Sequence, residues 1–309
     1  MSDPGSQPAT LVTIVSYCSR ESEYASAIVR NARAFSDLVV VCVGTRLYTG
    51  EPEDVQAEIA RFVKEDDGAE NGGAEDGDGG RVIAAVYDVS EHLLGTPIAL
   101  HNAARQAGVA AARRALSFSQ PFWALLIDGD EVPDGGRVRS WWQAPHGGGG
   151  VRADRTVVHK MANYWMFLHP QLLAEQLEDS VLLVHSDLLV HRDAMEHPRE
   201  RDGIYMWHQS SPIGLGNVRV ERMVLGEDGA PMFWHFSWVR GPIRGPDVVE
   251  GGRAAVKAKC ANWGHRADRD WDALIDEAFD GIEVGKWPER DFVHGYPLRL
   301  LDRLPSVVL

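Results

Sequence analysis

The sequence has little that would suggest a secreted, disulfide-bonded or membrane-spanning protein. It contains only three cysteines in 309 residues, Cys18, Cys42 and Cys260, and none of them stands in a C-x-x-C spacing. An odd, scattered set of this kind forms neither a disulfide framework nor a zinc site, and we interpret Cys18 and Cys42 as core thiols. No apolar run reaches the roughly 18 residues typical of a transmembrane helix, and the first residues lack a signal-peptide pattern. We therefore expect a soluble, cytoplasmic protein without a membrane span.

Positive charge is also scarce. Lys and Arg number 31 against 45 Asp and Glu, so the net charge is −14. A chain without a broad positive field cannot neutralise many phosphates, which argues against nucleic acid as a partner. A local basic site could still bind a small phosphorylated ligand. The apolar fraction of 44% is ordinary for a globular protein, and a chain of this length can bury a large core.

Residues 11–146 predict an α/β half. Short apolar, β-branched runs predict four buried strands, at residues 11–16, 38–43, 81–87 and 122–127. Apolar residues at helical spacing predict three helices, at residues 23–35, 53–63 and 98–116. This alternation favours a mostly parallel sheet that helices cover on both faces. Residues 1–10 predict a disordered tail, and the acidic, Gly-rich residues 64–80 a flexible loop.

Residues 147–309 have a less regular pattern. Gly147–Gly150 predicts a hinge or loop, and residues 151–250 are rich in His, Trp and Met. Short strand-like runs stand at residues 181–185 and 188–190. We expect an irregular α+β half of the same domain, which folds onto the first half and forms the other wall of a ligand crevice.

Polar residues follow the predicted strands at their carboxyl ends, where open α/β sheets bind their ligands. These residues are Ser16, Tyr17, Arg20, Gly44, Thr45, Asp88 and 128–131. We expect them to line one crevice.

The most informative motif is WALLIDGDEVP, residues 123–133, in which an apolar strand runs into three carboxylates. Carboxylates this close repel one another and lose hydration near a core, so a cation is expected nearby. The simplest interpretation is an exposed acidic turn. A second is a divalent-metal site, in which Asp128 and Asp130 both face Mg²⁺ or Mn²⁺ and Gly129 lets the backbone approach a ligand.

A third interpretation is a phosphatase. Asp128, Asp130 and Val132 match the D-x-D-x-[TV] signature of haloacid-dehalogenase-like phosphatases, with Asp128 as nucleophile and Asp130 as acid/base. Phosphatases of that type carry the motif on their first strand. Here three strand–helix units precede it, so the metal site is favoured.

The alternation up to LLIDGDEVP, with the helix HNAARQAGVAA at residues 101–111, resembles the nucleotide-sugar-binding half of GT-A fold glycosyltransferases, most closely family 2-like members. Further along, FWHFSW at residues 233–238, Lys257, Lys259 and WGH at residues 263–265 resemble the family that makes bisecting N-acetylglucosamine. One family feature is missing, because Gly44 stands where the second strand usually ends in an acidic residue.

The resemblance implies a GT-A fold, a Rossmann-like and mostly parallel sheet flanked by helices. It implies an enzyme, hexosyl- or N-acetylhexosaminyltransferase, that moves a sugar from a nucleotide-diphosphate donor to a glycan or other hydroxyl-bearing acceptor. Mn²⁺ or Mg²⁺ would be bound by Asp128, Asp130 and a distal histidine, with His235 as first and His265 as second choice. Donor-binding residues would be Ser16, Tyr17, Arg20, Asp88, Asn102, Arg105, Gly129, Lys257 and Lys259.

An inverting transferase also needs a general base beside the acceptor hydroxyl. The acidic side chains that the sequence offers are Glu131, Asp187, Asp193, Glu196 and Glu221, and nothing in it chooses among them. Aromatic runs at residues 163–167 and 205–208 could stack on an acceptor sugar, although aromatics at strand spacing more often belong to a core. A catalytically inactive, transferase-like protein that binds glycan or nucleotide is the remaining alternative.

Overall fold

The computed structural model describes residues 9–47, 50–67, 80–88, 97–145, 148, 150, 154–189, 219–241, 247–261 and 269–308, and gives only the backbone of residues 63–67, 97–102 and 261. Residues 1–8 of the predicted tail, residues 68–79 of the predicted acidic loop, and Gly147 and Gly149 of the predicted hinge lie outside these residues. The predicted start of the loop is wrong, because residues 64–67 continue a helix that ends at Asp67. Within the described residues, none of the helices is both long and apolar enough to cross a bilayer.

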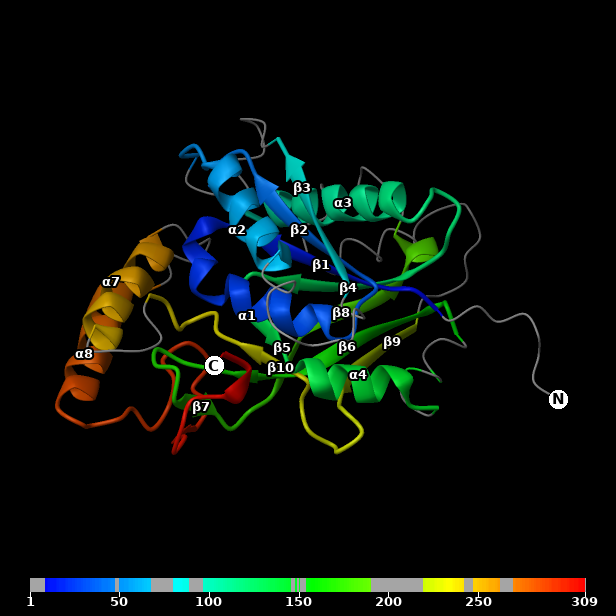
Figure 1. Ribbon diagram of the computed structural model, residues 1–309. Coiled ribbons are helices and arrows are strands. Elements are labelled where there is room, and N and C mark those ends of the chain that lie inside the picture. The colour runs from blue at the N-terminus through cyan, green and yellow to red at the C-terminus, as the bar shows by residue number, and fades with distance from the viewer. Residues whose placement is uncertain are drawn as a thin grey trace.

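A nine-stranded, mostly parallel sheet forms the centre of the molecule, with helices on both sides (Figure 1). Its strands follow the order β3-β2-β1-β4-β8-β6-β10-β5, and β9 pairs beside β6. The four predicted strands are confirmed as β1 (Leu11–Tyr17), β2 (Leu38–Gly44), β3 (Arg81–Tyr87) and β4 (Trp123–Asp128). All four are parallel.

The distal half extends this sheet. Its strands are β6 (Val157–Trp165), β8 (Glu178–His185), β9 (Arg219–Val224) and β10 (Phe233–His235). β8 runs antiparallel between β4 and β6, and β10 pairs with β6 on one side and with the short β5 (Glu131–Pro133) on the other. The two halves of the sequence therefore share one sheet.

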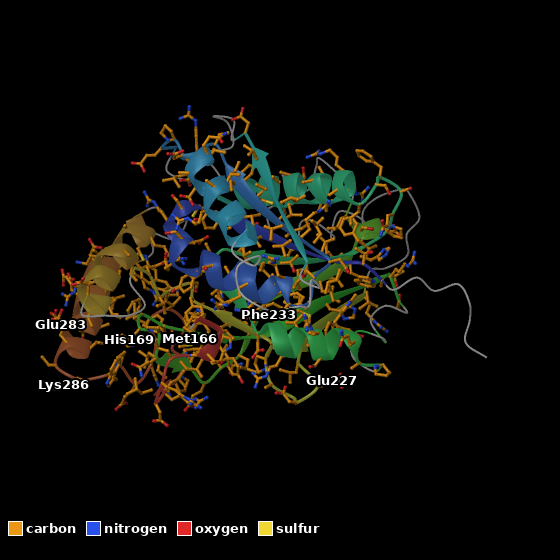
Figure 2. All side chains as sticks on the ribbon, in the orientation of Figure 1. Met166, His169, Glu227, Phe233, Glu283 and Lys286 are labelled. Carbon is orange, nitrogen blue, oxygen red and sulfur yellow. The ribbon has the colours of Figure 1, made fainter. Side chains whose placement is uncertain are left out.

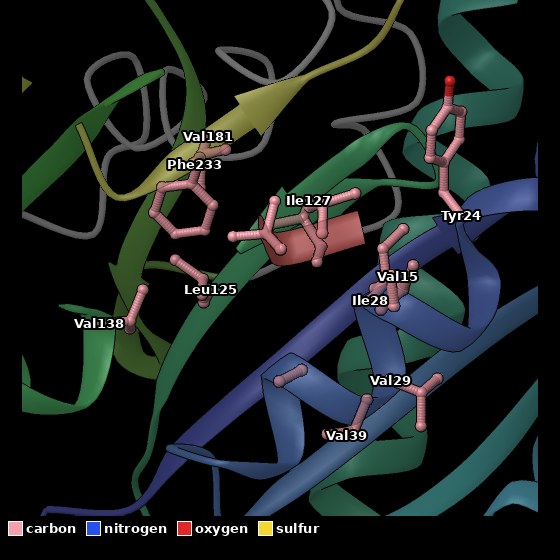
Figure 3. Close-up of a cluster of buried hydrophobic side chains, with 14 of the residues drawn as sticks. Val15, Tyr24, Ile28, Val29, Val39, Leu125, Ile127, Val138, Val181 and Phe233 are labelled. Carbon is pink, nitrogen blue, oxygen red and sulfur yellow. The ribbon is translucent and has the colours of Figure 1, made fainter. Parts of the chain in front are cut away.

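The helices of the first half that cover the sheet are α1 (Ser22–Arg33), α2 (Val55–Asp67), α3 (Pro97–Ala115) and α4 (Gly135–Gln143). Of these, α1, α2 and α3 confirm the predicted helices, whereas α4 was not predicted from the sequence. Alternate strand residues face opposite sides. Val15, Leu125 and Ile127 pack with Ile28 of α1 and Val138 of α4 (Figure 3), whereas their sequence neighbours form a second cluster with α3. Burial on both faces explains why these strands read as continuous apolar runs.

A third hydrophobic cluster lies in the distal half. There α7 (Val248–Ala261) and α8 (Trp271–Glu283) pack together (Figure 1). Trp165, Phe167 and Trp238 are buried against them. The strands β7 (Leu172–Ala174) and β11 (Leu298–Leu300) form a separate two-stranded sheet nearby.

One strand prediction is wrong. Leu188 does not begin a strand, because it ends the 3₁₀ turn η4 (Ser186–Leu188). The N–H of Asp187 donates to His185 Nδ1 over 3.3 Å, and this side-chain bond turns the backbone away from the sheet. Two further 3₁₀ turns, η1 (Ser19–Glu21) and η6 (Ser306–Val308), complete the described elements.

The close packing of α3 on the sheet gives a test of this architecture. A Cβ at Gly108 would lie 2.3 Å from Ile14 Cγ2 and 2.7 Å from Cys42 Sγ. We expect Gly108→Ala to force the helix outward and to lower the free energy of unfolding by about 1–3 kcal/mol in urea denaturation. Gly136→Ala is the control, because a Cβ there would meet only Asp134 Oδ1, at 3.6 Å. Equal effects of the two substitutions would contradict the packing.

Candidate functional site

The D-x-D motif lies where the order of the sheet reverses. The chain adds β2 and β3 on one side of β1 and then returns to place β4 on the other side. Ligands of open α/β sheets bind at such a switch point, beyond the carboxyl ends of the strands. Ser16, at the end of β1, is the direct neighbour of Asp128, at the end of β4. The sheet thus brings these two predicted residues together.

The distal half reaches this point through β10. Because β10 pairs antiparallel with β5, His235 lies opposite Glu131. The N–H of Phe236 donates to the carbonyl oxygen of Asp130 over 2.8 Å, which fixes the backbone of the motif. His235 is thereby placed beside the acidic turn, 104 positions further along the chain than its strand partner Glu131.

Asp130 is buried among cations. Its side chain accepts a 2.5 Å hydrogen bond at Oδ2 from Arg240 Nη2, and Lys259 Nζ lies 4.0 Å from the same oxygen. His235 Nε2 lies 3.6 Å from Oδ1. Burial alone would raise the pKa of Asp130, but Arg240, His235 and Lys259 together lower it below its usual value. The motif is therefore not an exposed acidic turn, and the protein itself supplies the expected cations.

Asp128 has a separate cationic partner. Arg105, on α3, donates from Nη2 to Asp128 Oδ1 over 2.7 Å and is fully buried. Two of its nitrogens, Nε and Nη1, are buried without a hydrogen-bond partner in the part of the chain that the structure describes. The Oγ of Ser16 is also buried without such a partner. Unsatisfied buried polar groups at one strand edge are typical of a ligand site.

Glu131 is bound into the turn. Its Oε2 accepts the N–H of Asp128 over 2.8 Å, and its Oε1 accepts the hydroxyl of Ser180 over 2.5 Å. The side chain is fully buried. These bonds join β4, β5 and β8, so Glu131 shapes the motif, and its position does not favour it as a base for an acceptor.

Glu21 is a site residue that the sequence did not reveal. A Cβ at Gly129 would lie 2.3 Å from Glu21 Oε2, so Gly129 makes room for this side chain. Arg240 Nη2 lies 3.4 Å from Glu21 Oε1. Burial and the nearby charge of Asp130 raise the pKa of Glu21 to about 8. Its carboxyl group therefore keeps a proton at neutral pH.

The two lysines predicted to bind the donor have different partners in the structure. Lys259, on α7, donates to the carbonyl oxygen of Ser237 and reaches Asp130, and burial followed by the charge of Arg240 lowers its pKa to about 8. Lys257 instead binds Asp276 on α8, with a shortest contact of 2.6 Å. Only Lys259 is near the motif.

Other predicted donor-binding residues have local partners. Tyr17 is buried in the core and donates to Glu58 Oε2 over 2.6 Å. Arg20 forms an exposed pair with Glu51, and Asp88 accepts the hydroxyl of Thr45 over 2.9 Å. The side chain of Asn102 and the whole of Asp193, Glu196 and His265 lie outside the described residues.

The other described base candidates, Asp187 and Glu221, lie away from the motif. Asp187 comes two residues after His185, the last residue of β8. His185 pairs with Trp123 at the start of β4, so Asp187 lies near the end of that strand opposite to Asp128. Glu221, on β9, lies 3.1 Å from His159 of β6, which is also toward that end of the strands.

An unpredicted acid lies nearer. Glu178, at the start of β8, has Oε2 3.6 Å from His235 Nδ1. The pairing of β8 with its neighbouring strands brings Glu178 close to His235, and no sequence motif predicts this position.

The described residues fit a metal only in part. They contain no group of three or more His, Cys, Asp or Glu side chains arranged around one ion. Asp130 Oδ1 and His235 Nε2 are 3.6 Å apart, a separation compatible with two ligands each about 2.1 Å from one cation. Mg²⁺ commonly takes one or two protein carboxylates and completes its shell with water and phosphate oxygens. A cation held by this pair would need such outside ligands.

Comparison with known proteins does not identify the chain. A scan against models of known protein families finds no match, and a search of curated proteins finds no significantly similar sequence. Function has to be argued from the chemistry of the site.

The protonated state of Glu21 predicts how stability depends on pH. The folded pKa of about 8 lies above the ordinary value of 4.5, so between these pH values the unfolded chain ionises Glu21 while the folded chain keeps the proton. The contribution of this group is fully present below pH 4.5 and is lost as pH rises to about 8. Denaturation of wild type and Glu21→Gln across this range should show a fall in unfolding free energy in wild type relative to the variant. A constant difference would contradict the assignment.

The Asp130–Arg240 pair predicts a large stability effect. Arg240→Leu leaves a buried carboxylate without its main partner and should cost about 3–5 kcal/mol of unfolding free energy. The matched control is Arg20→Leu, because Arg20 and Glu51 form a pair at 3.2 Å that is exposed on both sides, and such pairs contribute less than about 1 kcal/mol. Adding Asp130→Asn to Arg240→Leu should restore part of the loss. Similar losses from the two arginine variants would refute the burial argument.

Proposed function

We propose that the protein is a metal-dependent glycosyltransferase of the GT-A fold class that binds a nucleotide-diphosphate sugar at the end of β4. One observation carries the proposal. Asp130 and His235, which come from different halves of the sequence, face each other at the switch point and are joined there by Arg240 and Lys259. The order of β1 to β4 and the position of the motif after the fourth strand support the fold class.

Transfer of a sugar breaks the bond between its anomeric carbon and the diphosphate, and negative charge grows on the leaving phosphate. Asp130 and His235 would hold the divalent cation, which supplies Lewis-acid stabilisation of that charge. Arg240 Nη1 is buried without a hydrogen-bond partner among the described residues. This nitrogen and Lys259 Nζ would donate to the phosphate oxygens.

The donor's nucleoside would lie further along the same edge, beside Ser16 and Arg105. Their unsatisfied polar atoms are one hydroxyl oxygen and two guanidinium nitrogens. Arg105 also orients Asp128 through its third nitrogen. Asp128 would then act by positioning, through water to the cation or by accepting a ribose hydroxyl.

The phosphatase alternative is weaker in this geometry. The motif follows the fourth strand and not the first, and Arg105 holds the carboxylate that would have to attack phosphorus. An inactive protein that binds nucleotide has the same site and differs only in turnover.

Metal-dependent nucleotide binding tests the proposal. Calorimetric titration with UDP and GDP should show binding in Mn²⁺ that is lost in EDTA. At 100 times its dissociation constant the ligand should stabilise the fold by about 2.7 kcal/mol. Asp130→Asn and His235→Ala should weaken the metal-dependent binding by about 10-fold or more, because each removes a proposed ligand.

Asp154→Asn is the control, since that carboxylate is exposed and, among the described residues, bonds to Thr156 in its own turn and contacts Arg219. The absence of binding to either nucleotide with Mn²⁺ would refute the site, and equal affinity in Mn²⁺ and EDTA would refute its metal dependence. Hydrolysis of p-nitrophenyl phosphate that Asp128→Asn abolishes would instead support the phosphatase.

A further inference from the structure

Two aromatic rings lie at the border of the third hydrophobic cluster, with Tyr296 partly buried and His294 exposed. His294 and Tyr296 lie with their ring centroids 5.1 Å apart and their planes 30° from parallel. Both also contact the buried Trp165, at 5.2 and 5.9 Å. The His294 side chain is 45% exposed. By contrast, Trp165 and Phe167, which the sequence offered as an acceptor-stacking run, are fully buried.

A buried carboxylate fixes the loop that carries these rings. Asp291 accepts the backbone N–H groups of Val293 (2.8 Å), His294 (2.5 Å), Gly295 (3.3 Å) and Tyr296 (2.6 Å). The turn needs the positive φ of 76° at Gly295. Four bonds to one side chain set the loop conformation in advance, which lowers the entropy that a ligand would otherwise lose on binding.

Glu178 connects this ring pair to the motif. Its Oε1 lies 3.8 Å from His294 Nε2, and its Oε2 lies 3.6 Å from His235 Nδ1. Both distances are longer than a hydrogen bond. His235 in turn lies 3.6 Å from Asp130. The rings therefore stand two side chains away from the proposed diphosphate site, on the side contributed by the distal half.

We propose that His294 and Tyr296 bind the pyranose ring of a neutral carbohydrate acceptor, and that Glu178 accepts a hydrogen bond from one of its hydroxyl groups. A pyranose has a C–H face that packs on aromatic rings and an edge of hydroxyl donors. Aromatic walls with a few convergent polar groups are typical of small-ligand sites. The charge of Glu178, in a chain of net charge −14, selects against uronic and sialic acids. The role of this sugar as acceptor rests on the proposed transferase function.

Saturation-transfer NMR with methyl glycosides tests the ring pair directly. The probes are methyl glucoside, galactoside, mannoside and N-acetylglucosaminide, with methyl glucuronide as the anionic comparison. Wild type should transfer saturation to at least one neutral glycoside and not to the glucuronide. His294→Ala and Tyr296→Ala should reduce the signal at least fivefold, Tyr296→Phe should keep it, and Glu178→Gln should admit the glucuronide.

His169→Ala is the matched control. His169 also packs on a tryptophan, Trp287, at 5.0 Å, but its ring lies outside the set formed by Trp165, His294 and Tyr296. Figure 2 shows His169 close to Met166 and on the side of Glu283 and Lys286. This variant should keep the glycoside signal. His294 is exposed, so its replacement should leave the melting temperature within a few degrees of wild type.

The two proposals fail separately. The absence of a signal from every neutral glycoside in wild type, or an unchanged signal in both alanine variants, would overturn the carbohydrate site. So would a stronger signal from UDP that the same variants abolish, because the rings would then stack on a nucleotide base. His294→Ala and Tyr296→Ala should retain calorimetric binding of the nucleotide. Loss of nucleotide binding in wild type with an intact glycoside signal would refute the transferase and leave the ring pair supported.

Discussion

The site depends on the neutralisation of buried carboxylates by the protein's own cations. Asp130 cannot be removed from water at the end of a core strand unless a positive charge goes with it. Arg240 supplies that charge and also contacts Glu21. The pair joins the turn after β4 to the segment after β10, two parts of the chain that are 110 positions apart. Correct assembly of the distal half is thereby a condition for a stable motif.

Short strands make this arrangement possible. β5 and β10 have three residues each, yet their pairing sets His235 beside Asp130 and leads the chain toward Arg240. The hydrogen bond from the Phe236 N–H to the Asp130 carbonyl oxygen continues this pairing beyond the ends of the two strands. Tyr24, on α1, donates its hydroxyl to the carbonyl oxygen of Val239 over 2.8 Å and holds the same segment from the other side. The phenol oxygen points away from the aliphatic side chains of the core (Figure 3).

The sequence predicted the first half well for a physical reason. Strands buried on both faces must be apolar throughout, so β1, β2 and β4 were visible as runs and the position of Asp128 followed from them. β3 was also predicted as buried, but it lies at the end of the sheet order and Val86 is 49% exposed. Arg240 and Glu178 could not be predicted, because neither lies in a motif and both reach the site through long-range pairing. Glu21 lies in a polar turn after β1, and nothing in the sequence shows that its side chain packs against Gly129. The metal pairing of Asp130 with His235 and the transferase activity remain predictions.

The charges around Asp130 also bear on how a metal would bind. Its ion-pair contacts are with nitrogens, at 2.5 Å from Arg240, 3.6 Å from His235 and 4.0 Å from Lys259, while the charge of Asp128 opposes its ionisation. Asp130 therefore already has positive partners before any divalent ion arrives. A cation that bound Asp130 without other ligands would be repelled by the positive charge of Arg240. In the proposed function, a diphosphate that arrived with the cation would change this balance, because its oxygens could accept from Arg240 and Lys259 while they completed the metal shell.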